Sequence, residues 1–256
     1  MAVIFYLSGS GNSLYAAQQI AGKLEACRLE TIGSYLREPY AVKDEVVGIV
    51  CPVYCFALPP VVAQFLAKLK AKPSYTFGVV TMGGNQGRAL KQMSEALAAQ
   101  GITLQYAQTV VMPDNFFGIP LEKREKLIEA AEPTIIQIAQ DIALAKRDVT
   151  AVKEAYLWKL FGTSASWWYL KNRLNFENMT VDAAKCVGCN ICADICQMEN
   201  ITMVAGKPTF GNNCANCLGC VHWCPQSAIS AGKLTLDNSK RYVHPKINLP
   251  MMKGDK

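Results

Sequence analysis

Histidine is scarce in this chain. Its 256 residues include two, His222 and His244, and neither lies near a candidate nucleophile. The sequence therefore lacks the parts of a hydrolase site. A Gly-Lys-Ser/Thr phosphate loop and a complete G-x-G-x-x-G fingerprint are also missing, which excludes the common P-loop and the usual dinucleotide loop.

Long hydrophobic runs are missing as well. Pro52 and the pair Pro59–Pro60 interrupt the most apolar window, residues 46–67, so it reads as strand, loop and helix rather than as a membrane span. The first residues, MAVIFYL, carry no basic segment of the kind that begins an export signal. We therefore expect a cytoplasmic protein whose eleven cysteines bind metals or clusters rather than form disulfides.

Excess charge is confined to the second half. Residues 1–145 hold twelve basic and twelve acidic side chains, and 146–256 hold fourteen basic and eight acidic ones, of which 181–236 is neutral. The flanking basic excess predicts an acidic protein partner, with ordinary solvated lysines as the alternative. No basic run is interleaved with aromatics, so we expect no nucleic acid. Nothing indicates the oligomeric state.

The front of the chain alternates between strand-like and helix-like segments. Apolar runs at 3–7, 46–51, 76–82 and 102–112 predict strands, and amphipathic stretches at 12–26, 61–70, 89–100 and 122–146 predict helices. Strands that are apolar on both faces and separated by helices form a parallel sheet covered on both sides. The predicted class is a doubly wound α/β sheet with a second, smaller α+β domain. The ligand of the sheet should bind at the carboxyl ends of its strands.

The chain divides into four parts. Residues 1–146 form the front domain, and 147–180 an aromatic-rich connector for which we expect short packed helices. A cysteine-rich domain follows at 181–236, and a basic tail at 237–256 that contains RYVHP and should lie extended on another surface. The connector aromatics are Trp158, Phe161, Trp167, Trp168 and Tyr169.

Eight cysteines form a duplicated pattern with steps of three, three and four residues. The sets are Cys186, Cys189, Cys192 and Cys196, then Cys214, Cys217, Cys220 and Cys224. Three thiols at successive short gaps wrap a turn around a cubane cluster, and in a two-cluster fold the fourth thiol completes the neighbouring cluster. The predicted ligand sets are therefore crossed: Cys186, Cys189, Cys192 and Cys224 hold one 4Fe-4S cluster, and Cys214, Cys217, Cys220 and Cys196 hold the other.

Zinc is the alternative occupant. Structural zinc sites generally use two close pairs of ligands separated by a longer loop, which this pattern does not match. Residues 181–236 instead resemble the bacterial two-cluster ferredoxins. Ile201 and Ile229, each five residues after a fourth cysteine, should shield the clusters, and Gln197 stands where the second repeat has Pro225.

The loop SGSGNS follows the first predicted strand and leads into a helix. A glycine-containing loop at a helix N-terminus offers free N–H groups and a positive dipole to a phosphate. The serine hydroxyls of this loop could surround the phosphate and bind it without a lysine. The pattern resembles the FMN phosphate loop of flavodoxins, which implies that Ser8, Ser10, Gly11, Asn12 and Ser13 hold the FMN phosphate. An ordinary helix cap is the alternative.

Two more loops lie where flavodoxins hold the flavin ring. They are Pro52, Val53, Tyr54, Cys55 and Phe56 after one strand, and Thr81, Met82, Gly83 and Gly84 after the next. The resemblance implies that Tyr54 or Phe56 flanks the ring, and that the glycine amides approach its pyrimidine edge. A buried aromatic residue and a plain turn are the alternative. Cys55 is a weaker candidate for contact with the ring.

Nearly the whole chain resembles the flavodoxin–ferredoxin fusion proteins of anaerobes. The shared features are SGSGNS, CPVY with LPP, TMGGNQG, both cysteine sets and the RYVHP tail. The resemblance implies one FMN, two 4Fe-4S clusters, redox protein partners and an electron-transfer role between two-electron and one-electron carriers. The alternative is an enzyme, a quinone or flavin reductase fed through the clusters. A redox sensor whose clusters gate partner binding is a third possibility.

Overall fold

Five parallel strands form the central sheet. The computed structural model describes the chain except residues 117, 154–162, 176, 235, 237–238 and 254–256. Along the sheet the order is β2 (Cys27–Thr31), β1 (Ala2–Tyr6), β4 (Val46–Pro52), β6 (Tyr75–Met82) and β7 (Tyr106–Val111), with every neighbouring pair parallel. The chain adds β2 on one side of β1 and then adds β4, β6 and β7 on the other side, so the switch point lies between β1 and β4, as in the flavodoxin-like fold. The predicted doubly wound α/β class is confirmed.

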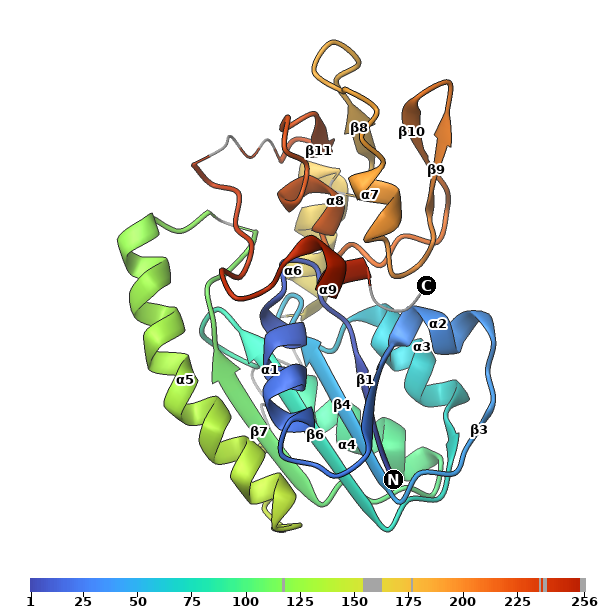
Figure 1. The fold of residues 1–256 in the computed structure, drawn as a ribbon, viewed down its shortest axis with the longest axis vertical. Coiled ribbons are helices and arrows are strands. Elements are labelled where there is room, and N and C mark those ends of the chain that lie inside the picture. Colours follow the sequence, from blue (N-terminus) through green and yellow to red (C-terminus); the bar gives the residue numbers. More distant parts are fainter. Residues whose placement is uncertain (117, 154–162, 176, 235, 237–238, 254–256) are drawn as a thin grey trace.

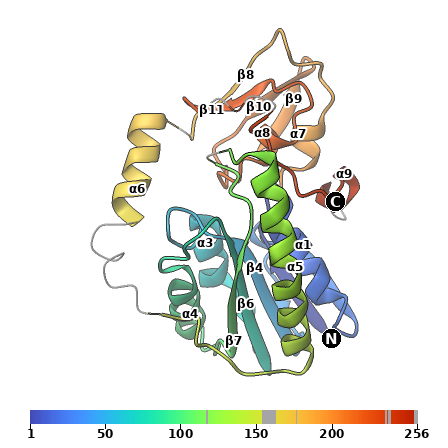
Figure 2. The same ribbon diagram turned by 90° about the vertical axis from the view of Figure 1, so that its left-hand side faces the viewer.

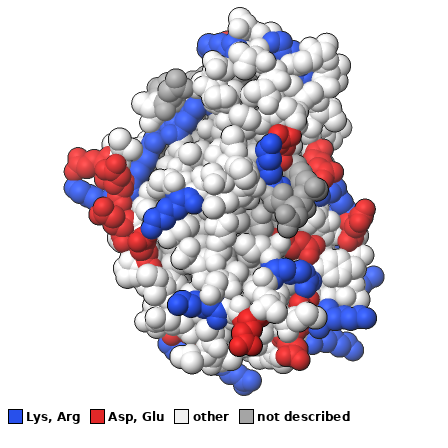
Figure 3. Space-filling model, viewed as in Figure 1, with Lys and Arg blue, Asp and Glu red and all other residues white. Residues whose placement is uncertain are grey.

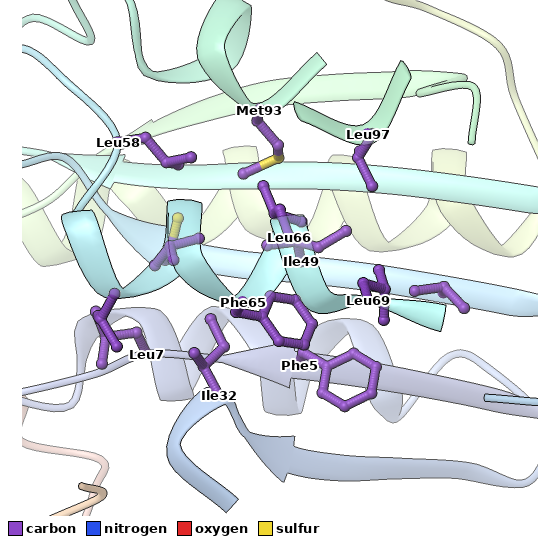
Figure 4. Packing of buried hydrophobic residues seen from close by; sticks show 14 of the residues in the cluster. Phe5, Leu7, Ile32, Ile49, Leu58, Phe65, Leu66, Leu69, Met93 and Leu97 are labelled. Atoms are coloured by element: carbon purple, nitrogen blue, oxygen red, sulfur yellow. The ribbon is translucent and has the colours of Figure 1, made fainter. Parts of the chain in front are cut away.

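Helices cover both faces of the sheet (Figures 1 and 2). One face packs against α1 (Asn12–Ala21) and α5 (Leu121–Ala143). The other packs against α2 (Ile32–Arg37), α3 (Pro60–Lys68) and α4 (Ala89–Ala99). Figure 4 shows this second layer, where Phe5 of β1 lies against Phe65 of α3 with ring centroids 4.9 Å apart. Burial of such side chains contributes about 1.5–3 kcal/mol each.

The sequence predictions missed several elements and misplaced some boundaries. The edge strand β2 and the following helix α2 were not predicted, because the strand sequence CRLET is only partly buried and carries no apolar run. The strand predicted at 102–112 begins at Tyr106, and the helix predicted at 12–26 ends at Ala21. A further short parallel pair, β3 (Ala41–Val42) with β5 (Lys70–Ala71), lies outside the central sheet.

The cysteine-rich domain is a small α+β unit above the carboxyl edge of the sheet (Figure 1). We call residues 1–146 the front half and residues 179–236 the cysteine half. It contains the antiparallel pairs β8 (Met179–Val181) with β11 (Ile229–Ala231) and β9 (Ile201–Val204) with β10 (Lys207–Phe210). Its short helices are α7 (Ile191–Asp194) and α8 (Gly219–His222). A third short helix, α9 (Leu249–Lys253), ends the described chain.

The duplication extends to the backbone. Positive φ angles recur at equivalent places in the two repeats, at 188 and 216, 190 and 218, and 199 and 227. Asn190 (φ 65°) and Leu218 (φ 58°) each follow a second cysteine and begin a helix. Leu218 occupies a conformation that favours glycine. The repeat therefore specifies one backbone path twice, whatever residue type stands at each turn.

The described part of the connector is helical, but two of its aromatic residues are exposed. A helix is present, α6 (Thr163–Tyr169), followed by a π-helical turn (Leu170–Leu174), and Figure 2 shows α6 standing away from the sheet. Trp168 is 58% exposed and Tyr169 is 52% exposed, so the expectation that these aromatics are packed is wrong for them. Trp158 and Phe161 lie outside the described residues. In the parts of the chain that the structure describes, no helix has the length and apolarity needed to cross a membrane.

Candidate functional site

A cavity opens at the carboxyl ends of β1, β4, β6 and β7. This is the edge at which doubly wound sheets bind ligands. Three of its walls come from the loops that the sequence singled out. The predicted residues lining it are Ser8, Ser10, Asn12, Ser13, Pro52, Val53, Tyr54, Thr81, Met82 and Gly83.

The loop after β1 is held in shape by its own hydroxyl groups. Ser8 Oγ accepts a hydrogen bond from Gly11 N (3.2 Å), and Ser13 Oγ bonds Thr81 Oγ1 (2.8 Å). All three serines of the loop are buried. Gly11 (φ 99°) begins α1 without a side-chain cap, and the first turn holds no acidic residue. The first amides of α1 are therefore available to an anion at the positive end of the helix dipole.

The loop after β4 contains a strained two-residue turn. Tyr54 and Ala57 exchange backbone hydrogen bonds of 2.9 and 2.8 Å, and the turn between them places Cys55 (φ 48°) and Phe56 (φ 60°) in the left-handed region. Such a turn favours Asn or Gly at both central positions, so this one costs on the order of 1 kcal/mol per residue. The turn directs Tyr54 into the cavity wall, whereas Cys55 and Phe56 are not among the lining residues.

A fourth wall was missed by the sequence reasoning. Met112, Pro113, Asp114 and Asn115, directly after β7, line the cavity together with Gly9. The signal was present, because carboxyl ends of neighbouring parallel strands meet at one edge, but the predicted strand ran through Met112. Two predicted residues besides Cys55 and Phe56 do not line the cavity, namely Gly11 and Gly84.

The eight repeat cysteines surround two further cavities. One is lined by Cys186, Cys189, Cys192 and Cys224; we call it the outer cavity. The other is lined by Cys196, Cys214, Cys217 and Cys220, and Cys192 also reaches it; we call it the inner cavity. The fold thus brings the fourth cysteine of each repeat to the other repeat's set. Ile229 lines the outer cavity and Ile201 the inner one.

Backbone amides point at several of these sulfurs. Asn200 N lies 3.3 Å from Cys196 Sγ, and Ala228 N lies 3.3 Å from Cys224 Sγ, at equivalent positions of the two repeats. Asn216 N makes a third such contact, 3.3 Å from Cys214 Sγ. Amide donors stabilise charge on sulfur, and hydrogen bonds of this kind tune iron–sulfur clusters.

Burial keeps several of these thiols protonated in the absence of a cation. It raises the pKa of Cys217 to about 12 and that of Cys192 to about 11, and it raises the pKa of Cys220 well above the usual range. A buried thiolate is costly unless a positive centre replaces the proton. The donor set, four thiols around a mainly apolar cavity, therefore suits a cationic iron–sulfur core.

Among the described residues, no three His, Cys, Asp or Glu side chains are grouped as they would be around a single metal ion. A zinc ion needs four ligands at about 2.0–2.3 Å from one point. The thiolates of a cubane are spread around a larger body, because each binds a different iron.

The inner cavity adjoins the cavity at the sheet edge. A Cβ built on Gly9 would lie 1.9 Å from the carbonyl oxygen of Cys217, so the two loops touch at a position where only glycine fits. Trp223 Nε1 also donates to Gly9 O (3.0 Å). Burial raises the pKa of Tyr54, and the nearby Cys217 and Cys214 raise it further. Gly9 and Tyr54 thus lie between the sheet-edge cavity and the inner cysteines.

Gln197 joins the two halves beside Cys196. Its Oε1 accepts from Ser8 N (3.2 Å), and its carbonyl oxygen accepts from the guanidinium of Arg37 (2.8 Å). A Cβ on Gly33 would lie 1.8 Å from that same carbonyl oxygen. The residue that departs from the proline of the second repeat is therefore a buried contact between the halves, with 4% exposure.

The solved structures named below resemble this chain over about half of its length. No family model matches the sequence, and no curated protein matches it. Solved structures that resemble it include the flavodoxin of Megasphaera elsdenii in its two-electron reduced form (20% identity, TM-score 0.34), over 52% of this chain and 99% of that one. A Fusobacterium nucleatum flavodoxin bound to flavin mononucleotide (12%, 0.40) matches over 57% and 98%. A Bacillus anthracis azoreductase (12%, 0.37) matches over 55% and 99%. At these values the strand order of the chain itself carries the fold assignment.

Proposed function

We propose that this chain is an electron carrier with one FMN in the sheet-edge cavity and two 4Fe-4S clusters in the inner and outer cavities. FMN takes one or two electrons and each cluster takes one, so the set would connect two-electron and one-electron carriers. The observation that carries the proposal is the contact of the sheet-edge loop with the inner cysteines, at Gly9 and Cys217.

Different residues would bind the phosphate, the ring face and the polar ring edge of the flavin. The hydroxyls of Ser10 and Ser13 and the first amides of α1 would bind the phosphate, which suits a buried hydroxyl-rich loop at a helix N-terminus. Tyr54, fixed by its strained turn, would pack on the ring, and the backbone around Gly83 would approach its polar edge. Asp114 lies beside Gly83, with Oδ2 3.0 Å from the position of a Cβ there. Its negative charge would disfavour an anionic reduced flavin.

The two cysteine cavities would hold the clusters in series. The inner cavity includes Leu7 of the front half in its lining, whereas the outer cavity is lined by the cysteine half alone. We place the inner cluster as the one that exchanges electrons with the flavin. The outer cluster would then meet the partner, since Cys189 is exposed and Val187 is 66% exposed there.

The partner of this carrier is proposed to be another redox protein. The face in Figure 3 carries few charges over the cysteine half at the top. Beside the outer cavity, the exposed Val187 would give the contact an apolar part. The basic excess in residues 146–180 and 237–256 would steer an acidic partner towards it. We place this activity in the cytoplasm, in anaerobic metabolism.

Anaerobic purification with metal and flavin analysis tests the proposal. We expect about eight irons, about eight sulfides and one FMN per chain, and EPR signals from two clusters on stepwise reduction. Colourless, zinc-loaded protein would contradict it. Rapid bleaching of the flavin by NAD(P)H would instead favour the reductase alternative.

A further inference from the structure

The C-terminal segment 241–253, which we call the clasp, crosses the phosphate loop and contacts both halves. Arg241 Nη2 donates to Ile229 O (3.1 Å) in the cysteine half. At the other end, Lys253 pairs with Asp194 of α7 (2.6 Å). Between these anchors the clasp lies on α1 and α5 (Figure 1).

Arg124 at the start of α5 fixes the entry to the clasp. Its guanidinium is buried and donates to Arg241 O and to Ser239 O, both at 2.8 Å. It also lies over the ring of Tyr242, 5.7 Å from the centroid. The next contact is to the cysteine half, where Tyr242 N donates to Nδ1 of buried His222 (3.1 Å).

The middle of the clasp is bonded to the phosphate loop itself. Tyr242 Oη donates to Asn12 Oδ1 (2.6 Å), and the amide of Asn12 in turn donates to Pro113 O (3.0 Å). His244 N donates to Ser10 O (2.8 Å). In a trans peptide the C=O and N–H point in opposite directions. The clasp therefore holds the Ser10 carbonyl outwards and the Gly11 N–H towards Ser8 Oγ, inside the loop.

Packing closes the same contact. His244 is fully buried and stacks on Tyr15 of α1, with ring centroids 4.2 Å apart. A Cβ on Gly11 would lie 3.1 Å from His244 Cβ and 3.2 Å from Ile247 Cβ. Lys246 pairs with Glu132 of α5. Gly11 is therefore needed both for its φ of 99° and to leave room for the clasp.

We infer that the clasp is a positioning element of the phosphate site: it fixes the binding geometry of the 8–13 loop and couples flavin binding to docking of the cysteine half. This inference rests on the proposed FMN site. Because binding free energies are linked, FMN should stabilise the docked clasp as much as the docked clasp strengthens FMN binding. Tyr242 and His244 act through the loop and are positioning residues.

Titration of the flavin-free full chain with FMN and with riboflavin, followed by flavin fluorescence, tests this inference. Tyr242→Phe removes one hydroxyl, so we expect FMN binding to weaken by about 3- to 10-fold. Riboflavin, which lacks the phosphate, should bind the variant and the wild type alike. Tyr75→Phe is the matched control, because Tyr75 Oη donates to Lys146 O (2.6 Å) at the opposite end of the sheet.

Hydrogen exchange supplies a second readout that needs no variant. Addition of FMN to the wild type should slow exchange of the amides of Tyr242 and His244, and riboflavin should slow it less. Equal FMN affinity in Tyr242→Phe and wild type, with no protection of these amides, would overturn the inference and leave the proposed function standing. Failure of the wild type to bind FMN at all would overturn both.

Discussion

The inner and outer cysteine cavities are built from one repeated backbone and placed in different surroundings. The outer cavity has an exposed cysteine, Cys189, beside the exposed Val187. The inner cavity lies against the front half, where Gly9 and Gln197 make the contacts. Duplication thus supplies two equivalent sets of four cysteines, and contact with the front half makes their surroundings unequal. Exposure and hydrogen bonding are the main influences on cluster potential, so the two sites should differ in potential as well as in access.

Removing one ligand from each cavity gives the largest expected effect. Cys220→Ala and Cys189→Ala should each lower the iron content from about eight to about four per chain. In the serial arrangement, only Cys220→Ala should abolish electron exchange between the flavin and the remaining cluster, whereas Cys189→Ala should slow delivery to an external acceptor. Rapid photoreduction with absorbance detection measures both. The opposite assignment of the two defects would reverse the order of the clusters.

The contact between the halves can be broken at Gly9. Gly9→Ala places a methyl group 1.9 Å from a backbone carbonyl oxygen, which must move. We expect a loss of about 2–3 kcal/mol of stability and at least a tenfold slower exchange between flavin and inner cluster. Gly22→Ala is the control, because its Cβ would lie 3.5 Å from Gln18 O, in ordinary contact. Unchanged exchange in Gly9→Ala would show that this contact is not needed.

Gln197 sharpens the same comparison with a smaller change. Gln197→Ala leaves the Ser8 N–H without its acceptor in a buried place, at a cost of about 1–3 kcal/mol. Gln92→Ala is matched to it, since Gln92 Oε1 accepts from Leu58 N (2.8 Å) within the front half. The midpoint temperature of thermal unfolding should fall by a similar amount in both variants. Only Gln197→Ala should slow electron exchange between the flavin and the inner cluster. Equal rates in the two variants would argue against an interdomain role.

Acid should loosen the clasp by a still smaller amount. Burial lowers the pKa of His244 to about 4, against about 6.5 in an open chain. Neighbouring Lys246 also lowers this pKa, and Glu132 raises it. Tyr15 stacks on the imidazole ring. Because the pKa of His244 is lower in the folded state, the unfolded chain binds the proton first as the pH falls below about 6.5. The free energy of unfolding is therefore highest above that pH and decreases as the pH drops towards 4. The loss should be about 1 kcal/mol by pH 5.5.

Hydrogen exchange at residues 242–247 between pH 7.5 and 5.5, corrected for intrinsic rates, measures this loss. His244→Phe, which keeps an aromatic ring on Tyr15, should remove about half of the dependence. The other half should come from buried His222 beside Tyr242, because burial lowers the pKa of this histidine to about 4 as well. A dependence as steep in His244→Phe as in the wild type would contradict the assignment.

Much of the fold could be predicted because the signals were local. Apolar strands at β1, β4 and β6 depend on neighbouring residues in sequence, and the structure places them as expected. The cysteine spacing is also a local signal, and Cys224 and Cys196 each line the cavity of the other repeat. Edge strand β2 escaped because a half-exposed strand has no apolar run. The roles of Gly9 and Gln197 escaped because each depends on a partner in the other half of the chain. Asp114 escaped because the predicted strand ran through Met112, which hid the loop after β7. The exposed Trp168 shows the converse, since an aromatic residue need not be packed.

The central claim is that flavin and inner cluster exchange electrons within one chain. Photoreduction of the flavin followed by cluster absorbance, repeated over a hundredfold range of protein concentration, tests it most directly. The account predicts a first-order transfer whose rate is independent of concentration. A rate that rises in proportion to concentration would show transfer between molecules and would contradict the account.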